Sequence, residues 1–197
     1  MTANNNVMEK RTVTYFMSPG PANTRQTLNI AAKYVQDAGI KTVLIATNSG
    51  KTALEAADIF PPTVRIIAIT HVTGFTAPNV QELSDENRLA LLKKQITVFT
   101  GQHAFGGVGR AVRNKLGTYQ LDEIMAFTLR VFGQGTKVAI ELAMMAADAG
   151  LIRTDETVVS IGGTGTGADT ALALQGANSA HFFDMKVREV ICKPCEF

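Results

Sequence analysis

The sequence lacks the long apolar runs and clustered charges that membrane and nucleic-acid proteins use. No run of about 18 apolar residues occurs, and no stretch of consecutive Lys and Arg exceeds two residues. The formal net charge is only +2, too small for the basic surface that binds nucleic acid. Residues 2–6 are polar and unlike a secretory signal. We therefore expect a cytoplasmic protein with no membrane or nucleic-acid partner.

Cysteine is also scarce, since the chain has only Cys192 and Cys195, in a C-x-x-C spacing. That spacing occurs in redox sites and in halves of zinc sites. A redox pair relies on a following helix, and a zinc site needs two further ligands, but only Glu196 and Phe197 follow here. We favour a structural interpretation of the pair and assign no metal ligand.

The composition is that of a compact globular domain. Hydrophobic residues make up 46% of the 197-residue chain and charged residues 18%, which is typical of one well-buried core. No repeat or linker interrupts the sequence. We expect a flexible leader over residues 1–10 and a single domain over residues 11–197, with a homo-oligomer as a further expectation.

Strand and helix patterns alternate along the chain. Continuous β-branched runs such as residues 42–46 are typical of strands covered on both faces in a parallel sheet. The alternation predicts a three-layer α/β/α sandwich with a mostly parallel sheet. Strands are predicted at residues 12–16, 42–46, 64–70, 96–100, 157–161, 170–174 and 186–191, and helices at residues 23–38, 51–60, 121–132 and 136–149, with one more opening at Ser84.

Local signals mark several helix ends. Asn23 followed by Gln26 predicts a capping box, and Gly39 predicts the end of that helix. Ser84, followed by two acidic residues, predicts another helix start. Residues 101–109 are glycine-rich and are predicted to form a loop. The apolar stripe expected on the Ser84 helix consists of Leu89, Leu91 and Leu92.

Several anion-binding features are concentrated where the strand at residues 42–46 turns into a helix. A helix start offers unpaired N–H groups and the positive end of the helix dipole. Glycine lets the backbone approach a ligand, hydroxyls donate hydrogen bonds, and lysine adds charge. Ligands of parallel sheets also bind at the carboxyl ends of strands. These features predict a phosphate site in the 47–52 loop, which consists of Thr47, Asn48, Ser49, Gly50, Lys51 and Thr52.

Two other interpretations of the 47–52 loop are available. Its last three residues match the end of the P-loop pattern, but the first glycine of that pattern would fall at Ile45, inside the strand. A nucleoside triphosphatase is therefore disfavoured. Alternatively, Ser49 and Thr52 merely cap the helix. We prefer the anion site because a cap rarely needs so many donors.

Residues 43–53, followed by residues 64–70, resemble the C-terminal α/β domain of pyruvate kinase. The family pattern is a hydroxyl residue, any residue, Ser-Gly, Arg or Lys, Ser or Thr, and Ala. In regulated members this loop holds a phosphate of a sugar-bisphosphate effector. The matching positions here are Thr47, Ser49, Gly50, Lys51 and Thr52.

The resemblance extends to small stand-alone relatives of that domain, some of which are associated with flavin mononucleotide (FMN). It implies a small phosphorylated ligand, with FMN as a candidate cofactor. Pyruvate kinase performs its chemistry in a separate (β/α)8 barrel, so we expect no pyruvate kinase activity here. The wider likeness rests on residues 70–75, 101–110, 144–150 and 161–170.

A second glycine-rich loop follows the strand predicted at residues 157–161. Gly163, Gly165 and Ala168 satisfy the dinucleotide fingerprint, but the fingerprint requires a helix next, and residues 170–174 look like a strand. We therefore discount dinucleotide binding. Gly163, Thr164 and Gly165 are instead candidates for a second wall of the phosphate site, with a plain turn as the alternative.

Two predicted strand ends are followed by histidines, His71 and His103. Each is a candidate site residue or a structural hydrogen-bonding residue. Gly74 and Phe75 follow His71, and the Phe75 ring can stack on a flat ligand such as a flavin. Arg110 is a candidate clamp for an anion. His181 follows no strand end.

The helix predicted at residues 136–149 is nearly apolar all round, which predicts a buried helix. Its polar exceptions, Lys137, Glu141 and Asp148, lie on roughly one stripe. They either face a polar cavity or pair within the structure. Glu141 is the best candidate acid or base, but no catalytic residue is assigned.

Three functions fit these observations. The first is a binding protein for a phosphate-bearing ligand, either FMN or a sugar phosphate. The second is an enzyme acting on a phosphorylated metabolite, with His71, His103 or Glu141 carrying protons and Arg110 as clamp. The third is a regulatory or interaction module with a vestigial effector site. Whether the protein is an enzyme is left open.

Overall fold

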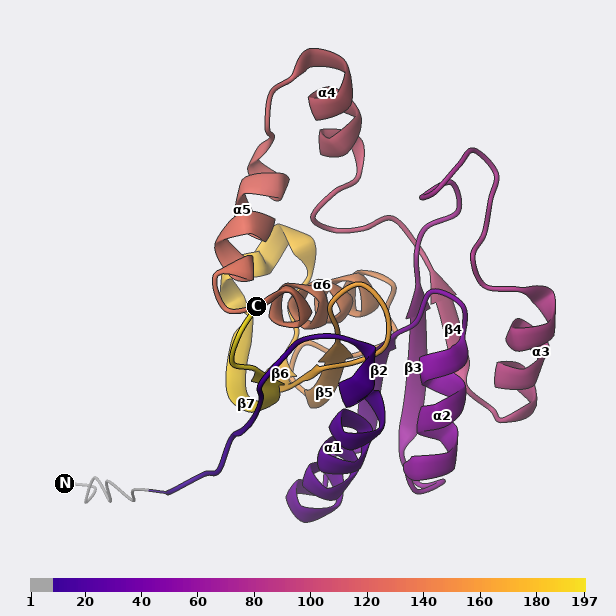
Figure 1. The fold of residues 1–197 in the computed structure, drawn as a ribbon, viewed down its shortest axis with the longest axis vertical. Helices are drawn as coiled ribbons and strands as arrows, with labels where there is room; N and C mark the ends of the chain where they lie inside the picture. Colours follow the sequence, from indigo (N-terminus) through magenta and orange to yellow (C-terminus); the bar gives the residue numbers. More distant parts are fainter. Residues whose placement is uncertain (1–8) are drawn as a thin grey trace.

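The computed structural model describes residues 9–197, within which seven strands form one sheet (Figure 1). Only β6 runs antiparallel to its neighbours, so the predicted α/β/α sandwich with a mostly parallel sheet is confirmed. Most of the predicted leader lies outside the described residues. The strands in spatial order are β1 (Thr14–Phe16), β7 (Lys186–Pro194), β6 (Thr170–Gln175), β5 (Thr157–Gly162), β2 (Thr42–Ala46), β3 (Arg65–Thr70) and β4 (Thr97–Thr100).

Helices cover both faces of the sheet. One core packs α1, α2 and α3 against the sheet, and the other packs α6 against the opposite face. Side-chain alternation along β2 divides the strand between the cores, with Val43 and Ile45 in the first and Leu44 in the second. The helices are α1 (Thr24–Ala38), α2 (Lys51–Ile59), α3 (Asp85–Lys93), α4 (Val108–Leu116), α5 (Leu121–Arg130) and α6 (Gln134–Asp148), with 3₁₀ turns at Pro21–Asn23 and Ser179–Asp184.

Helix α6 is the buried helix that the sequence predicts. Most of its residues are buried, because it lies across β5, β2 and β6.

Among residues 9–197, no helix is both long and apolar enough to cross a membrane.

The prediction of a loop over residues 101–109 is wrong at its end. Helix α4 begins at Val108, so Arg110 lies in a helical first turn rather than in a loop. Glycines at positions 106, 107 and 109 have low helix propensity and hide this start. No residue of α4 is buried, and the helix stands clear of the sheet at the top of Figure 1.

Two local predictions are also corrected. The Asn23 side chain does not cap α1; its amide donates to the Ser18 carbonyl, because the preceding 3₁₀ turn already gives Asn23 a helical backbone. On α3, Leu89 and Leu92 are exposed and only Leu91 is buried, since this helix lies at the edge of the molecule.

Two other helix-end signals are confirmed. Gly39 ends α1 in the left-handed conformation, with φ 67°. Ser84 caps α3, and its hydroxyl accepts a hydrogen bond from the Asn87 amide at 3.2 Å.

Candidate functional site

A cavity of about 730 Å³ lies at the carboxyl ends of the central parallel strands. The last residues of β2 and β3, the start of α2, one side of α6 and the loop after β5 line it. This is where parallel α/β sheets place their ligands, and the volume lies within the usual range for small-molecule sites. Strand order therefore brings segments that are far apart in the sequence around one hollow.

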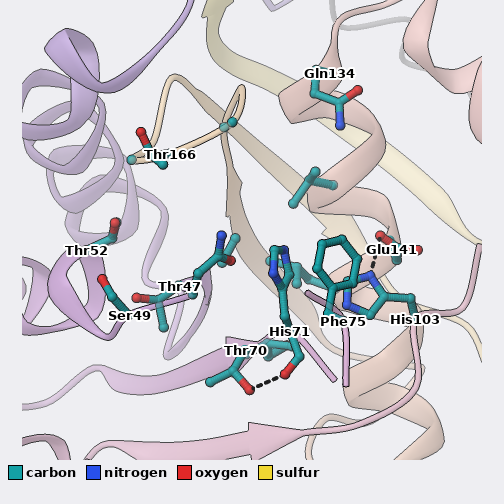
Figure 2. A pocket seen from close by; sticks show the side chains of 18 of the residues that line it. Thr47, Ser49, Thr52, Thr70, His71, Phe75, His103, Gln134, Glu141 and Thr166 are labelled. Atoms are coloured by element: carbon teal, nitrogen blue, oxygen red, sulfur yellow. Dashed lines mark hydrogen bonds and ion pairs between the residues drawn. The ribbon is translucent and has the colours of Figure 1, made fainter. Parts of the chain in front are cut away.

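The start of α2 forms one end of the cavity. Thr47, Ser49, Lys51 and Thr52 line it, and the three hydroxyl side chains gather there in Figure 2. Gly50 is the N-cap residue, and no side chain within the described part of the chain caps the helix. The alternative in which Ser49 and Thr52 are caps is therefore wrong. The first amides of α2 are left available to an anion.

The Thr47 hydroxyl is an unsatisfied group at this end. Thr47 is only 3% exposed, and within residues 9–197 its Oγ1 has no hydrogen-bond partner. Its backbone amide, in contrast, donates to the Ile69 carbonyl at 3.0 Å. A buried hydroxyl without a partner costs free energy, which a bound oxyanion would recover by accepting its proton.

Gly50 has a conformational role at the start of α2. Its own atoms do not line the cavity. Its φ of 92° is left-handed, and an added Cβ would lie 2.8 Å from Leu83 Cδ1. Asn87 fixes the same turn, because its side-chain amide donates to the Ser49 carbonyl at 2.7 Å. Glycine is required here for backbone conformation and packing.

The loop after β5, residues 163–169, forms a second wall. Gly163 and Gly165 line the cavity, whereas Thr164 does not. Asp169 holds the loop in place: it is fully buried, and its Oδ2 accepts from the amides of Thr164 at 3.1 Å and Gly20 at 2.9 Å. Asp169 was not predicted as a site residue, although a lone acidic residue closing a glycine-rich run was the available signal.

The loop leads directly into β6, which runs antiparallel to β5. The dinucleotide fingerprint requires a helix at this point. The strand predicted at residues 170–174 is therefore confirmed, and the loop departs from the fingerprint at this point.

An aromatic cluster borders the cavity beyond the end of β3 (Figure 2). The Phe75 ring centroid lies 4.0 Å from that of His71 and 5.2 Å from that of His103. The Arg110 guanidinium lies over the Phe75 ring, 4.8 Å from its centroid. His71 Nδ1 is 2.6 Å from Glu82 Oε2. The cavity is lined by His71, Phe75, His103 and Arg110, but Gly74 does not line it.

A buried polar group lies on the α6 side of the cavity. Lys137 Nζ donates to Glu141 Oε2, one helical turn away, and Glu141 Oε1 accepts from the Phe105 amide at 2.8 Å. His103 Nδ1 is 3.9 Å from Glu141 Oε2 (Figure 2). His103 Nε2 accepts from the Val72 amide at 3.4 Å, which places the proton of a neutral ring on Nδ1, facing Glu141.

Burial changes the proton affinities of this group. It lowers the pKa of His103 from 6.5 to about 4, so the ring is neutral near pH 7. It also lowers the pKa of Lys137 from its ordinary value, although Glu141 acts in the opposite direction. Both effects arise because a charged form loses hydration when its side chain leaves water.

Three residues considered from the sequence lie away from the cavity. Asp148 accepts hydrogen bonds from Asn178 and Ser179, and His181 lies in the 3₁₀ turn that begins at Ser179. Cys192 is buried, which raises the pKa of its thiol to about 12. In the described residues, no group of three or more His, Cys, Asp and Glu side chains is arranged to hold a metal ion.

Most of the thirteen predicted site residues thus surround one cavity, with Gly50, Gly74 and Thr164 outside its lining. The sequence did not predict that Lys137, Glu141 and His103 would meet there. The likeness inferred from the 47–52 loop is confirmed, because the family model "Pyruvate kinase, alpha/beta domain" matches residues 25–173.

Proposed function

The chain belongs to the pyruvate kinase alpha/beta domain family, and from this premise we propose that its cavity binds a small phosphate-bearing molecule. The phosphate is accepted by the uncapped first turn of α2 and by the hydroxyls of Thr47, Ser49 and Thr52. The unpartnered Thr47 hydroxyl carries this proposal, because a buried donor at a helix start points to an absent acceptor.

A sugar phosphate fits the opposite end of the cavity better than FMN does. Lys137 and Glu141 offer donors and an acceptor to hydroxyl or carbonyl oxygens. A flavin stacked on Phe75 must instead share that ring with His71, His103 and Arg110, which already contact it. We therefore place sugar phosphates first and keep FMN as the second ligand class.

The proposal includes binding without pyruvate kinase activity. An enzyme acting on the same ligand is a second candidate, favoured by the buried Lys137–Glu141 pair and His103 inside the cavity. In that version, His71, His103 or Glu141 carries protons and Arg110 clamps an anionic group. A module with a vestigial effector site is the outcome if no ligand binds.

Self-association forms a further part of the proposal. Helices α4 and α5 and the loop between them carry large apolar side chains that are at least half exposed, an arrangement typical of interaction surfaces. Light scattering coupled to gel filtration should give a mass above that of one chain. The side chains concerned are Val108, Leu116, Tyr119, Leu121, Ile124 and Phe127.

Calorimetric titration of the purified chain tests ligand binding directly. The panel is inorganic phosphate and three phosphate esters, namely a triose phosphate, a pentose phosphate and FMN, each ester beside its unphosphorylated form. We expect saturable binding of phosphorylated members only, weakened in Thr52→Val but not in the exposed, distant Thr63→Val. An absorbance scan and native mass spectrometry reveal any co-purified flavin. No response to any phosphorylated compound would refute the proposal.

A further inference from the structure

Lys137 is the buried lysine of this chain. It is 5% exposed, whereas the other lysines of residues 9–197 are exposed or, for Lys193, half-buried. Burial of a lysine without several hydrogen-bond acceptors is costly; within residues 9–197 its ammonium has one acceptor, Glu141, and lies 5.6 Å from the centroid of the Phe105 ring. An ammonium has three donors, so two remain for a ligand in the cavity that Lys137 lines.

We infer that Lys137 forms an imine with the aldehyde or ketone group of a phosphorylated ligand. The inference rests on the proposed phosphate site, since the phosphate at α2 would hold the carbonyl end within the cavity. Lysines that form imines are typically desolvated and lie near other cationic groups. Arg110 and Arg130 line the same cavity.

Glu141 supplies the proton transfer that this reaction needs. Its Oε2 takes a proton from the Lys137 ammonium, and the freed amine attacks the carbonyl carbon. The C=O π bond opens, and the protonated carboxyl returns the proton to the oxygen, giving a carbinolamine that is still protonated on nitrogen. Glu141 then takes a proton from that nitrogen and delivers it to the hydroxyl, which leaves as water while the nitrogen lone pair forms the C=N bond of the iminium. The balance is ammonium plus carbonyl to iminium plus water, with no oxidant or reductant.

The surroundings favour this exchange. The Phe105 amide fixes Glu141 through its other oxygen at 2.8 Å, so the carboxyl keeps its orientation toward Lys137. His103 is neutral near pH 7 and directs its Nδ1 proton toward Glu141. Burial lowers the pKa of Lys137, which increases the fraction of free amine.

Reductive trapping tests the inference on the full chain. Glycolaldehyde phosphate is incubated with the protein, borohydride is added, and digested peptides are weighed and fragmented. We expect the reduced adduct on Lys137, enriched several-fold over the exposed Lys51 at the phosphate end and over Lys186. Lys137→Met should remove this adduct, and Glu141→Gln should slow its formation several-fold.

Equal labelling of Lys137 and the exposed lysines would overturn the imine. The wild-type peptide map gives this answer even if a variant fails to fold. Inorganic phosphate binding is measured alongside: binding without a Lys137 adduct overturns the imine and leaves the phosphate site standing. A third result separates the two claims in the other direction. If glycolaldehyde and its phosphate ester label Lys137 equally, and inorganic phosphate does not compete with either, the imine is supported and the phosphate site is contradicted.

Discussion

Replacing Thr47 by valine should stabilise the protein and weaken its ligand binding. Valine has nearly the shape of threonine but no hydroxyl. The Thr47 backbone amide keeps its bond to the Ile69 carbonyl, so the strand end is unchanged. In the free protein the change removes a buried oxygen that has no partner among the described residues. In the complex it removes a donor to the phosphate.

The two effects have opposite signs and measurable sizes. An unsatisfied buried polar group costs about 1–3 kcal/mol, so Thr47→Val should raise the free energy of unfolding by about 1 kcal/mol. A hydrogen bond to a charged group contributes about 1.5–3 kcal/mol. Losing it should weaken phosphate binding roughly tenfold to a hundredfold.

Urea unfolding and calorimetric titration measure the two effects on the same samples. Thr170→Val is the matched control, because that buried hydroxyl donates to Asp169 Oδ1 at 2.8 Å. Its loss leaves a buried carboxylate short of one donor and should destabilise the protein. If Thr47→Val also destabilises the protein, or leaves affinity unchanged, the assignment of its hydroxyl to a ligand is refuted.

Three further predictions concern charge, pH and backbone. Lys51→Ala should weaken phosphate binding several-fold at low ionic strength but only slightly at high ionic strength, because salt screens the exposed Lys51 charge. In the same titrations the control Lys41→Ala, at the other end of β2, should leave phosphate binding unchanged. His103 has a folded pKa of about 4, below its ordinary 6.5, so neutral His103 contributes stability that is lost as pH falls from about 6.5 to 4. Urea unfolding across this range should therefore show a shallower pH dependence in His103→Gln, and an unchanged dependence would contradict the lowered pKa of His103. Gly50→Ala should lower the free energy of unfolding by about 1–3 kcal/mol, because it combines a left-handed backbone with a steric clash. Gly39→Ala should destabilise the protein less, because an added Cβ meets open space there. Equal urea midpoints for the two variants would argue against that packing.

Local patterns predicted the strand, loop and helix around residues 42–59 well. The β-branched run that forms β2 is buried on both faces, and its abrupt change to polar residues with a glycine marks the turn into α2. These signals lie within a few residues of each other in the sequence. The same locality explains why Gly39 and Ser84 were correctly identified as helix-end signals.

Long-range contacts explain what the sequence could not predict. From the sequence, Gly50 was expected to let the backbone approach a ligand. The structure adds that Leu83, more than thirty positions later, leaves no room for a side chain at Gly50. His103 follows β4 and meets Glu141 only because α6 crosses the opposite face of the sheet. Asp169 organises a loop through the amide of Gly20, from the other end of the chain. No sequence spacing reports such convergence.

Amide proton–nitrogen NMR spectra recorded during a titration with inorganic phosphate test the central claim most directly. At constant ionic strength, the amides of residues 48–53 should shift together and saturate, because they lie at the uncapped start of α2. Chloride at the same ionic strength should leave them in place. Shifts that never saturate, or that saturate elsewhere while these amides stay still, would show that the start of α2 does not hold the anion.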